Sequence, residues 1–514
     1  MSESIDDLFA RYGPSYRGLL TTAAITASFT MVMSGTIVNV ATPDVMGAFG
    51  IGLDRAQLVS SAFNVALVTS QLLNSWIVAT FGQRNGFMLM SVIFVIGSLL
   101  CALSGNFDWI VVGRVLQGVA AGVVQPLIMV TMFQVYPAER RGFAMAVYSM
   151  GVFMAVAVGP IFGGLAIDLL DWRYIFWLPV PIIAVSAVMG WLFVPQTRAE
   201  ERSPFDWVGY GLLVVSVYCF LTGFTEGGRF GWSSGYIISL FVVGIVSAIA
   251  LVLSQLREGP TLIDLSLFKY RQYTLIAIIA FVFGVGNFGS GYGVPVFVQL
   301  VQGYTPLDAA LLMLPSSLLL VATLPFTGWL ADNIRPHIGI MIGLALFTVG
   351  TIPMGFADVN TSFVALMTYF IISRLGMSFT SPFLMNTALG ALPREKLNAG
   401  GGTINFCRQL GGSLGLAAWV MFVQTRTTMH SESFTATQSP SNATTQEMLE
   451  RVKQLLSEAG LPEELRTPSA LQYLSEVIQA QASTRGFQDG FLILVISFLA
   501  AMIPAYILGR RRRR

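Results

Sequence analysis

The chain repeats apolar runs of about 20 residues along its whole length, and this pattern limits the fold more than any other feature. A helix of that length crosses the hydrocarbon core of a bilayer and satisfies its own backbone hydrogen bonds there. Only 11% of the residues are charged, against about a quarter in a soluble protein. The sequence therefore predicts an all-α polytopic membrane protein. Its fourteen expected spans are 18–40, 56–80, 86–104, 109–133, 143–166, 172–194, 206–226, 236–256, 273–300, 309–331, 338–357, 363–388, 397–424 and 487–508.

Basic residues mark one side of the predicted bundle. The short loops on the opposite side carry only Arg55, Arg173 and Arg229, near span ends. Because cytoplasmic loops are enriched in Lys and Arg, we expect a multi-pass protein of the bacterial inner (plasma) membrane with both termini in the cytoplasm. The basic residues that fall on the cytoplasmic side are Arg84, Arg140, Arg141, Arg198, Arg202, Arg257, Lys269, Arg271, Arg335, Arg394, Lys396 and Arg510–Arg514.

The two halves of the chain resemble each other at a nearly constant spacing. The equivalent pairs are Arg114 and Arg374 (374 − 114 = 260), Pro137 and Pro393 (393 − 137 = 256), and Ser75 and Gly328 (328 − 75 = 253). Such a repeat is typical of transporters whose site lies between the two copies.

This repeat predicts the domain organisation. The expected parts are a cytoplasmic N-terminal segment (1–17), an N-terminal six-helix bundle (18–200), a two-helix insert (201–258), a C-terminal six-helix bundle (259–508) and a basic cytoplasmic tail (509–514). Segment 1–17 is either a short interfacial helix or a solvated tail. Residues 425–486 form an extracytoplasmic loop, with short amphipathic helices expected at 448–456 and 468–482.

Small residues recur every fourth position in the fifth predicted span. Gly151, Ala155, Gly159 and Gly163 share one helical face, which lets another helix approach closely. Pro160 removes a backbone donor, so the helix can bend there. The ladder suits a helix that rocks against its neighbour, and packing alone explains it equally well.

Together the motifs resemble the major facilitator superfamily, and more narrowly its fourteen-span drug:proton antiporter family of the EmrB/QacA type. The resemblance covers nearly the whole chain. It implies the major facilitator fold, with two six-helix bundles plus two inserted helices, and export of drugs in exchange for protons. The matching segments are 36–41, 114–126, 151–165, 172–176, 260–268 and 405–413.

Three departures from that family pattern bear on mechanism. Ser34 stands where the family usually has an acidic residue in the first span. The loop after the second span reads Ser75–Thr80, without the glycine and aspartate of the usual G-x-L-A-D-R pattern, so Ala79 replaces the aspartate. The second copy of this motif keeps Asp332, and Pro179 replaces an asparagine in the sixth span.

Arginines inside predicted spans are functional candidates, because ionisable side chains are costly in a bilayer. The resemblance gives Arg114 a part in proton coupling or conformational control; the alternative is a structural arginine bonded to carbonyls. Arg374 and Arg408 either face the cavity, favouring anionic or hydrogen-bond-accepting substrates, or bridge helices. The candidate residues for transport and coupling are Arg114, Gln117, Gly118, Gly151, Gly159, Pro160, Gly163, Arg374 and Arg408.

Polar residues in the spans predict a substrate cavity, although hydrogen bonding between helices explains each nearly as well. The candidate cavity residues are Ser34, Thr36, Asn39, Asn64, Gln71, Asn287 and Gln299. The resemblance places Asp332 at an inner gate that pairs with basic residues, beside Glu139 and Arg140. With Ala79 in the first copy, this gate would be one-sided.

None of the 27 acidic residues lies near the centre of a predicted span. A proton-coupled exporter of cations needs a buried carboxylate, so we expect a neutral, amphipathic or anionic substrate and a proton carrier at a span end, such as Asp168 or Glu226. We expect a transporter and not an enzyme, with no cofactor, metal or nucleic acid. Its partners would be the lipid bilayer, a small amphipathic substrate and a periplasmic adaptor protein.

The favoured function is secondary active export of amphipathic drugs or toxic compounds by alternating access. One alternative is an exporter or facilitator of a specific lipid or metabolite without the usual proton coupling. The other is a membrane sensor or scaffold that binds but does not transport.

Overall fold

The computed structural model describes residues 3–196, 204–257, 259, 261–439 and 441–510, and these residues form helices and loops without strands. Fourteen helical segments in this part of the chain are long and apolar enough to cross a membrane. This confirms the predicted number of spans and the all-α class. The predicted boundary at 200/201, the boundary at 258, Arg198, Arg202, Pro260 and tail residues 511–514 lie outside the described residues.

The N-terminal half is a bundle built around α7. Its helix α2 packs on α8 and α10, whereas α4 and α6 pack on α7. The helices of this half are α1 (Ile5–Tyr12), α2 (Tyr16–Ile37), α3 (Thr42–Phe49), α4 (Leu53–Ser70), α5 (Asn74–Phe81), α6 (Gln83–Leu103), α7 (Phe107–Val135), α8 (Arg141–Leu169), α9 (Tyr174–Trp177) and α10 (Pro179–Phe193), with 3₁₀ turns η1 (Gly13–Ser15), η2 (Gln71–Leu73) and η3 (Ala138–Arg140).

The C-terminal half repeats this arrangement. Its helix α13 packs on α17 and α19, whereas α15 packs on α16 and α19. The helices of this half are α13 (Arg271–Leu300), α14 (Pro306–Asn333), α15 (Pro336–Thr351), α16 (Phe363–Gly390), α17 (Leu397–Thr437), α18 (Ala443–Glu458) and α19 (Glu463–Gly509), with 3₁₀ turns η4 (Leu265–Lys269), η5 (Pro353–Phe356) and η6 (Arg394–Lys396).

Contacts between the halves run mainly through α8, which packs on α14 and α16, and through α7, which packs on α17. Between the halves in sequence lie α11 (Trp207–Phe230) and α12 (Gly235–Gln255), which pack on each other. Helix α11 also contacts α4 and α17, so the inserted pair touches both halves.

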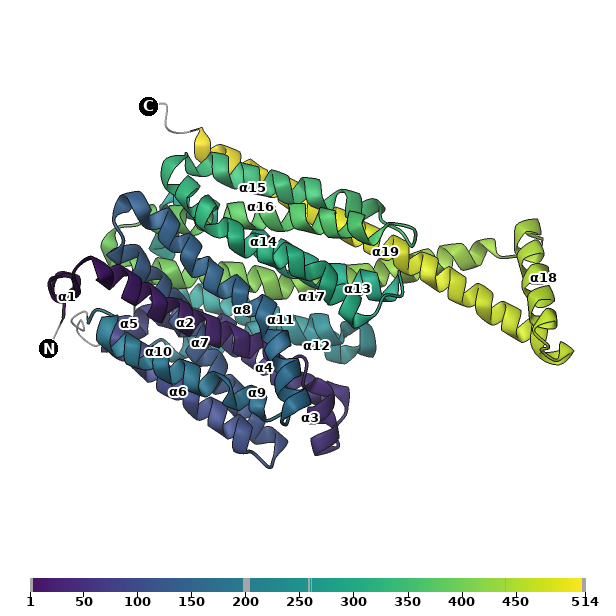
Figure 1. The fold of residues 1–514 in the computed structure, drawn as a ribbon, viewed down its shortest axis with the longest axis horizontal. Coiled ribbons are helices and arrows are strands. Elements are labelled where there is room, and N and C mark those ends of the chain that lie inside the picture. Colours follow the sequence, from purple (N-terminus) through teal and green to yellow (C-terminus); the bar gives the residue numbers. More distant parts are fainter. Residues whose placement is uncertain (1–2, 197–203, 258, 260, 440, 511–514) are drawn as a thin grey trace.

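The segment predicted as an outer loop is largely helical. Helices α17 and α19 continue past the bundle and form an arm capped by α18, on the side away from both termini (Figure 1). The expected helix at 448–456 lies within α18, but residues 468–482 belong to the 47-residue helix α19. The arm therefore combines two extended spans with one separate helix, α18, so the prediction of a separate short helix is confirmed at 448–456 and wrong at 468–482. Glu, Gln, Leu and Ala favour helix and carry α19 through the polar region.

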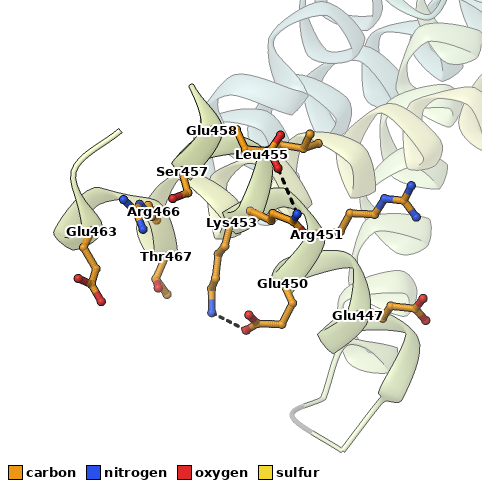
Figure 2. Close-up of a pocket in the computed structure, with 11 residues that line it drawn as sticks. Glu447, Glu450, Arg451, Lys453, Leu455, Ser457, Glu458, Glu463, Arg466 and Thr467 are labelled. Atoms are coloured by element: carbon orange, nitrogen blue, oxygen red, sulfur yellow. Dashed lines mark hydrogen bonds and ion pairs between the residues drawn. The ribbon is translucent and has the colours of Figure 1, made fainter. Parts of the chain in front are cut away.

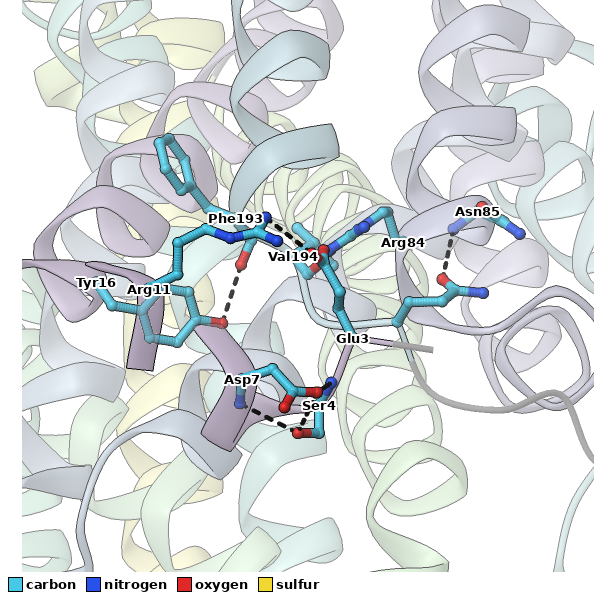
Figure 3. A network of polar contacts seen from close by, with 10 residues as sticks. Glu3, Ser4, Asp7, Arg11, Tyr16, Arg84, Asn85, Phe193 and Val194 are labelled. Carbon is cyan, nitrogen blue, oxygen red and sulfur yellow. Dashed lines mark hydrogen bonds and ion pairs between the residues drawn. The ribbon is translucent and has the colours of Figure 1, made fainter. Parts of the chain in front are cut away.

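Of the two alternatives for segment 1–17, the structure contains the helix. Ser4 caps α1 with a capping box that Asp7 completes. The Glu3 carboxylate pairs with Arg84 at 2.6 Å and with Arg11 at 2.8 Å (Figure 3). The hydrogen bond from Arg84 lowers the pKa of Glu3. Because Arg84 also donates to the carbonyl of Val194 at 2.8 Å, this cluster ties the N-terminal segment to the ends of α6 and α10.

Candidate functional site

Arg114 lies completely buried inside the N-terminal half. Its Nε donates to the carbonyl of Val59 on α4 at 2.9 Å, and its Nη1 donates to the carbonyl of Ser34 on α2 at 3.0 Å. Gln117 accepts a third bond from Nη1 at 2.8 Å, and the guanidinium lies over the ring of Phe63. These partners are neutral, so Arg114 joins three helices through carbonyls, an amide and a ring face.

The other two span arginines lie in the C-terminal half and are also buried. Arg374 on α16 donates to Asn287 at 2.9 Å and to Ser290 at 3.2 Å, both on α13. Arg408 on α17 donates to Asn405 of its own helix at 3.0 Å, and its Nε has no partner among the described residues. Arg374 therefore bridges two helices, whereas Arg408 keeps unused hydrogen-bonding capacity.

The small-residue ladder of α8 packs on α2 of the same half. A Cβ at Gly151 would approach Ile25 to 3.2 Å, and one at Gly163 would approach the carbonyl of Ile37 to 3.0 Å. Gly159 lies against Thr36 in the same interface. The two helices therefore approach closely along this face, and Pro160 lies within the continuous helix α8 beside it. Gly118 makes an equivalent close approach to α4.

The first-span cavity candidates lie in three different environments. Ser34 is fully buried, and its backbone carbonyl holds Arg114. Thr36 bonds to the carbonyl of Met33 on its own helix, at the contact with Gly159. Asn39 is exposed and accepts from Ser60 at 3.0 Å. The structure thus spreads these residues along the end of α2 and the turn that follows it, and does not gather them at one point.

The other cavity candidates are similarly divided. Asn64 and Gln299 each donate to a carbonyl of their own helix, at 3.0 Å and 3.1 Å. Asn287 belongs with Arg374, as described above. Gln71 is fully buried in η2, and neither its amide nitrogen nor its amide oxygen has a partner among the described residues. Of this set, Gln71 is the side chain with the most unused hydrogen-bonding capacity.

The predicted gate residue Asp332 crosses from α14 to the start of α8. Its two oxygens accept from the backbone amides of Gly142 at 2.5 Å and Phe143 at 3.0 Å. The carboxylate therefore caps the positive end of α8 from the other half of the protein. In the described part of the chain, no ion pair joins Asp332 to a basic side chain, so its partner differs from the predicted one. Glu139 and Arg140 are exposed beside this contact.

One side of α17 meets the N-terminal half, and this contact includes side chains from both halves that were not among the predicted site residues. Asn74 of α5 donates to the carbonyl of Asn398 at 3.0 Å. Asn405 contacts the sulfur of Met129 on α7 at 3.4 Å. Tyr148 of α8, which lies near enough to Arg408 to feel its charge, is buried, and its hydroxyl has no partner in the part of the chain that the structure describes. A tyrosine inside an apolar span, three residues before Gly151 at the start of the small-residue ladder, is the signal that could have identified Tyr148.

Cavities lie along the arm. Near its tip a cavity of about 910 Å³ lies between α18 and the start of α19, and Lys453 pairs there with Glu450 at 3.0 Å (Figure 2). A second cavity of about 310 Å³ lies nearer the bundle, among Phe434, Met448, Leu474, Val477 and other residues. The arm therefore has a charged surface at its tip and an apolar surface nearer the bundle.

Comparison with known proteins is consistent across sequence and structure. The family description of the Major Facilitator Superfamily matches residues 24–416. The multidrug export protein EmrB of Haemophilus influenzae is 29% identical over 94% of each chain, and EmrB of Escherichia coli K12 is 30% identical over 85% of this chain and 86% of that one.

Two solved structures share the fold. The human organic anion transporter MFSD10 superposes with a TM-score of 0.60 at 12% identity, covering 94% of this chain and 99% of that one. The proton:xylose symporter XylE superposes with a TM-score of 0.58 at 13% identity, covering 94% and 95%. At such identities the likeness shows the arrangement of helices.

Proposed function

This chain belongs to the major facilitator superfamily, and on that premise we propose that it is a secondary active exporter of amphipathic drugs or toxic compounds. It would work by alternating access, coupled to proton uptake. The relatives named as multidrug export proteins support this substrate class, since their sequences match this chain over most of its length.

The observation that carries the proposal is the contact between the halves at the side of the termini. There Asp332 holds α8, and Gly142 and Gly328 let α8 and α14 meet backbone to backbone. Towards the arm side, α8 instead packs on α2 of its own half through Gly159 and Gly163. A contact between halves that is tight at one end is what a closed gate of an alternating-access transporter requires.

Arg114 would act in conformational control through the helices it joins. Its bonds to α2 and α4 hold the helix that packs against the ladder of α8. An Arg114→Gln variant should lose two bonds to buried carbonyls, and each such bond to a charged group contributes about 1.5–3 kcal/mol. We expect this variant to transport at least tenfold more slowly while Arg114→Lys retains part of the rate.

A second candidate, a facilitator or exporter without proton coupling, is favoured by the acidic residues. Every described Asp and Glu is at least partly exposed. A proton carrier would therefore have to lie at a span end, as Asp168, Glu226 and Asp489 do. Asp489 is already paired with Arg426 and His430, at 2.6 Å and 2.8 Å.

We place both termini in the cytoplasm and the arm outside. An even number of spans puts the two ends of the chain on one side, with the arm on the other (Figure 1). The arm would then reach into the periplasm of a bacterium with two membranes, where the surface between α17, α18 and α19 would meet an adaptor protein.

The test uses purified protein in liposomes with an internal pH dye and an imposed proton gradient. Cationic, neutral and anionic amphiphiles are added one class at a time. We expect one class to be transported and to dissipate the gradient while it moves. Transport without proton movement would favour the second candidate, and binding without any transport would refute both.

A further inference from the structure

Every buried charged side chain in the described part of the chain is an arginine. Arg84 is paired with Glu3 at the start of α6. The remaining three, Arg114, Arg374 and Arg408, lie inside membrane spans with neutral partners. An arginine stays protonated in a protein, so the interior carries positive charge that no buried carboxylate balances.

The three arginines differ in what they can reach. Arg114 is enclosed within the N-terminal half, and Arg374 is bound to α13 within the C-terminal half. Arg408 lies on the side of α17 that faces the other half, one turn from Asn405, which contacts Met129. A substrate that enters between the halves would therefore meet Arg408.

Unused hydrogen-bonding groups from both halves lie along this same contact. Within the described ranges, Arg408 Nε and the hydroxyl of Tyr148 have no hydrogen-bond partners, and the amide of Gln71 has none on either atom. These side chains are 7%, 3% and 0% exposed. The backbone carbonyl of Gln71 lies against Gly402 of α17, and Tyr148 is close enough to Arg408 for each to feel the other's charge. A buried polar group without a partner costs about 1–3 kcal/mol, so a ligand with acceptor oxygens would gain by filling these positions.

We propose that Arg408, Tyr148 and Gln71 bind the anionic head group of an amphipathic substrate, a carboxylate, sulfonate or phosphate. The guanidinium would donate to two head-group oxygens, and the phenol and amide would donate from the N-terminal half. This inference rests on the proposed exporter function and gives its substrate class. Because the donors come from both halves, binding of the head group would also depend on whether the protein is open to the inside or to the outside.

The test measures binding to the full-length protein in lipid nanodiscs. Three fluorescent probes share a dansyl group and an undecyl chain, and end in a carboxylate, in its methyl ester or in a trimethylammonium group. We expect the carboxylate to bind at least about tenfold more tightly than the ester, as for a hydrogen bond to a charged group. Equal affinities, or tightest binding of the trimethylammonium probe, would refute the site.

Variants locate the preference. Arg408→Gln should abolish the preference for the carboxylate probe over its ester by weakening only carboxylate binding. Arg408→Lys should keep part of this preference, and Tyr148→Phe should reduce it several-fold. Arg271→Gln, which removes a charge at the exposed start of α13, is the matched control and should retain it. Folding is checked by size-exclusion chromatography; if Arg408→Gln does not fold, the lysine and phenylalanine variants decide. A preference unchanged by these substitutions would refute the assignment.

The same probes separate this inference from the exporter function. Transport of amphiphiles in liposomes without a preference for the carboxylate would leave the exporter proposal standing and remove the site. A preference that depends on Arg408, without transport of any probe, would keep the site and overturn the exporter.

Discussion

On the side of the termini, the starts of two helices, α8 and α17, each contact the opposite half of the protein. We call these two contacts crossings, and different hydrogen bonds hold them. The start of α8 is capped by the carboxylate of Asp332, which accepts from two backbone amides. By the repeat, the equivalent start lies in α17 at Asn398 (142 + 256 = 398), and the equivalent of Asp332 is Ala79 (332 − 253 = 79). Helix α5 does contact α17, but there Asn74 donates to the carbonyl of Asn398 at 3.0 Å.

The difference shows how one repeat can keep a contact while changing its strength. A carboxylate bonded to helix amides combines a charge-assisted hydrogen bond with the helix dipole. An asparagine bonded to a carbonyl is a neutral pair of about half that strength. We therefore expect the crossing at α8 to dominate closure of the gate, and the crossing at α17 to release first.

The largest effect is expected for Asp332→Ala. It leaves two helix amides at the crossing uncapped and should cost the closed state about 1.5–3 kcal/mol, a shift of at least tenfold towards the open one. Spin labels at Asn85 and Arg394, both exposed on opposite halves, would report a longer distance. The background replaces Cys101, Cys219 and Cys407. An unchanged distance distribution would mean that this contact does not hold the gate.

Gly142→Ala tests the same crossing through packing. The added Cβ would lie 2.7 Å from the Asp332 carboxylate and 2.8 Å from the carbonyl of Gly328. Since backbone has to move, we expect a cost of about 1–3 kcal/mol to the closed state. The same labels should again show a longer distance. Gly164→Ala is the matched control, because nothing lies within 4 Å of a Cβ there.

Ala79→Asp would make the two crossings alike. A carboxylate at this position should cap the start of α17 as Asp332 caps α8, and an added cap is worth about 0.5–2 kcal/mol. The distance distribution should narrow towards the closed state, and transport should slow. If the variant behaves as the parent chain does, the two starts are not equivalent and the repeat alignment at this loop is wrong.

The fold could be predicted from the sequence because few backbone structures are stable in the lipid core of a membrane. An apolar run that crosses a bilayer has to be a helix, so the runs predicted all fourteen spans. The ends of α17 and α19 were not predictable in this way. Beyond the membrane a polar segment can form a loop or a helix, and residues 425–437 and 463–486 continue the two spans as helix.

The candidate site was predictable in its charges and not in its partners. Arg114, Arg374 and Arg408 stood out because a charge in a span is costly. Their acceptors include the carbonyls of Val59 and Ser34, and any residue provides a carbonyl. The partner of Asp332 is likewise a pair of backbone amides, which leaves no mark in the side-chain sequence. Such pairings depend on how the helices pack.

Asn74→Leu tests the weaker crossing with a side chain of similar size. It removes the bond to Asn398, a neutral hydrogen bond worth about 0.5–1.5 kcal/mol, and leaves the Asp332 contact intact. We expect a twofold to tenfold shift in the label distance distribution, smaller than for Asp332→Ala. A shift as large as that of Asp332→Ala would show that the two crossings open together and not in sequence.

The smallest effect is expected for the ion pair that precedes α17 within its own half. Lys396 lies 3.1 Å from Asp264, and both side chains are about a third exposed. Burial raises the pKa of Asp264, but hydrogen bonds from Ser266 and Lys396 outweigh it and lower the pKa overall.

A lowered pKa in the folded state gives stability that is present at neutral pH and lost as the pH falls through the folded value. Asp264→Asn should therefore cost less than about 1 kcal/mol at neutral pH, because the pair is screened by solvent, and nothing in acid, because Asp264 is then protonated. Thermal unfolding of both proteins across this pH range measures the difference. A gap that widens in acid would show that Asp264 does not stabilise the start of α17 through its charge.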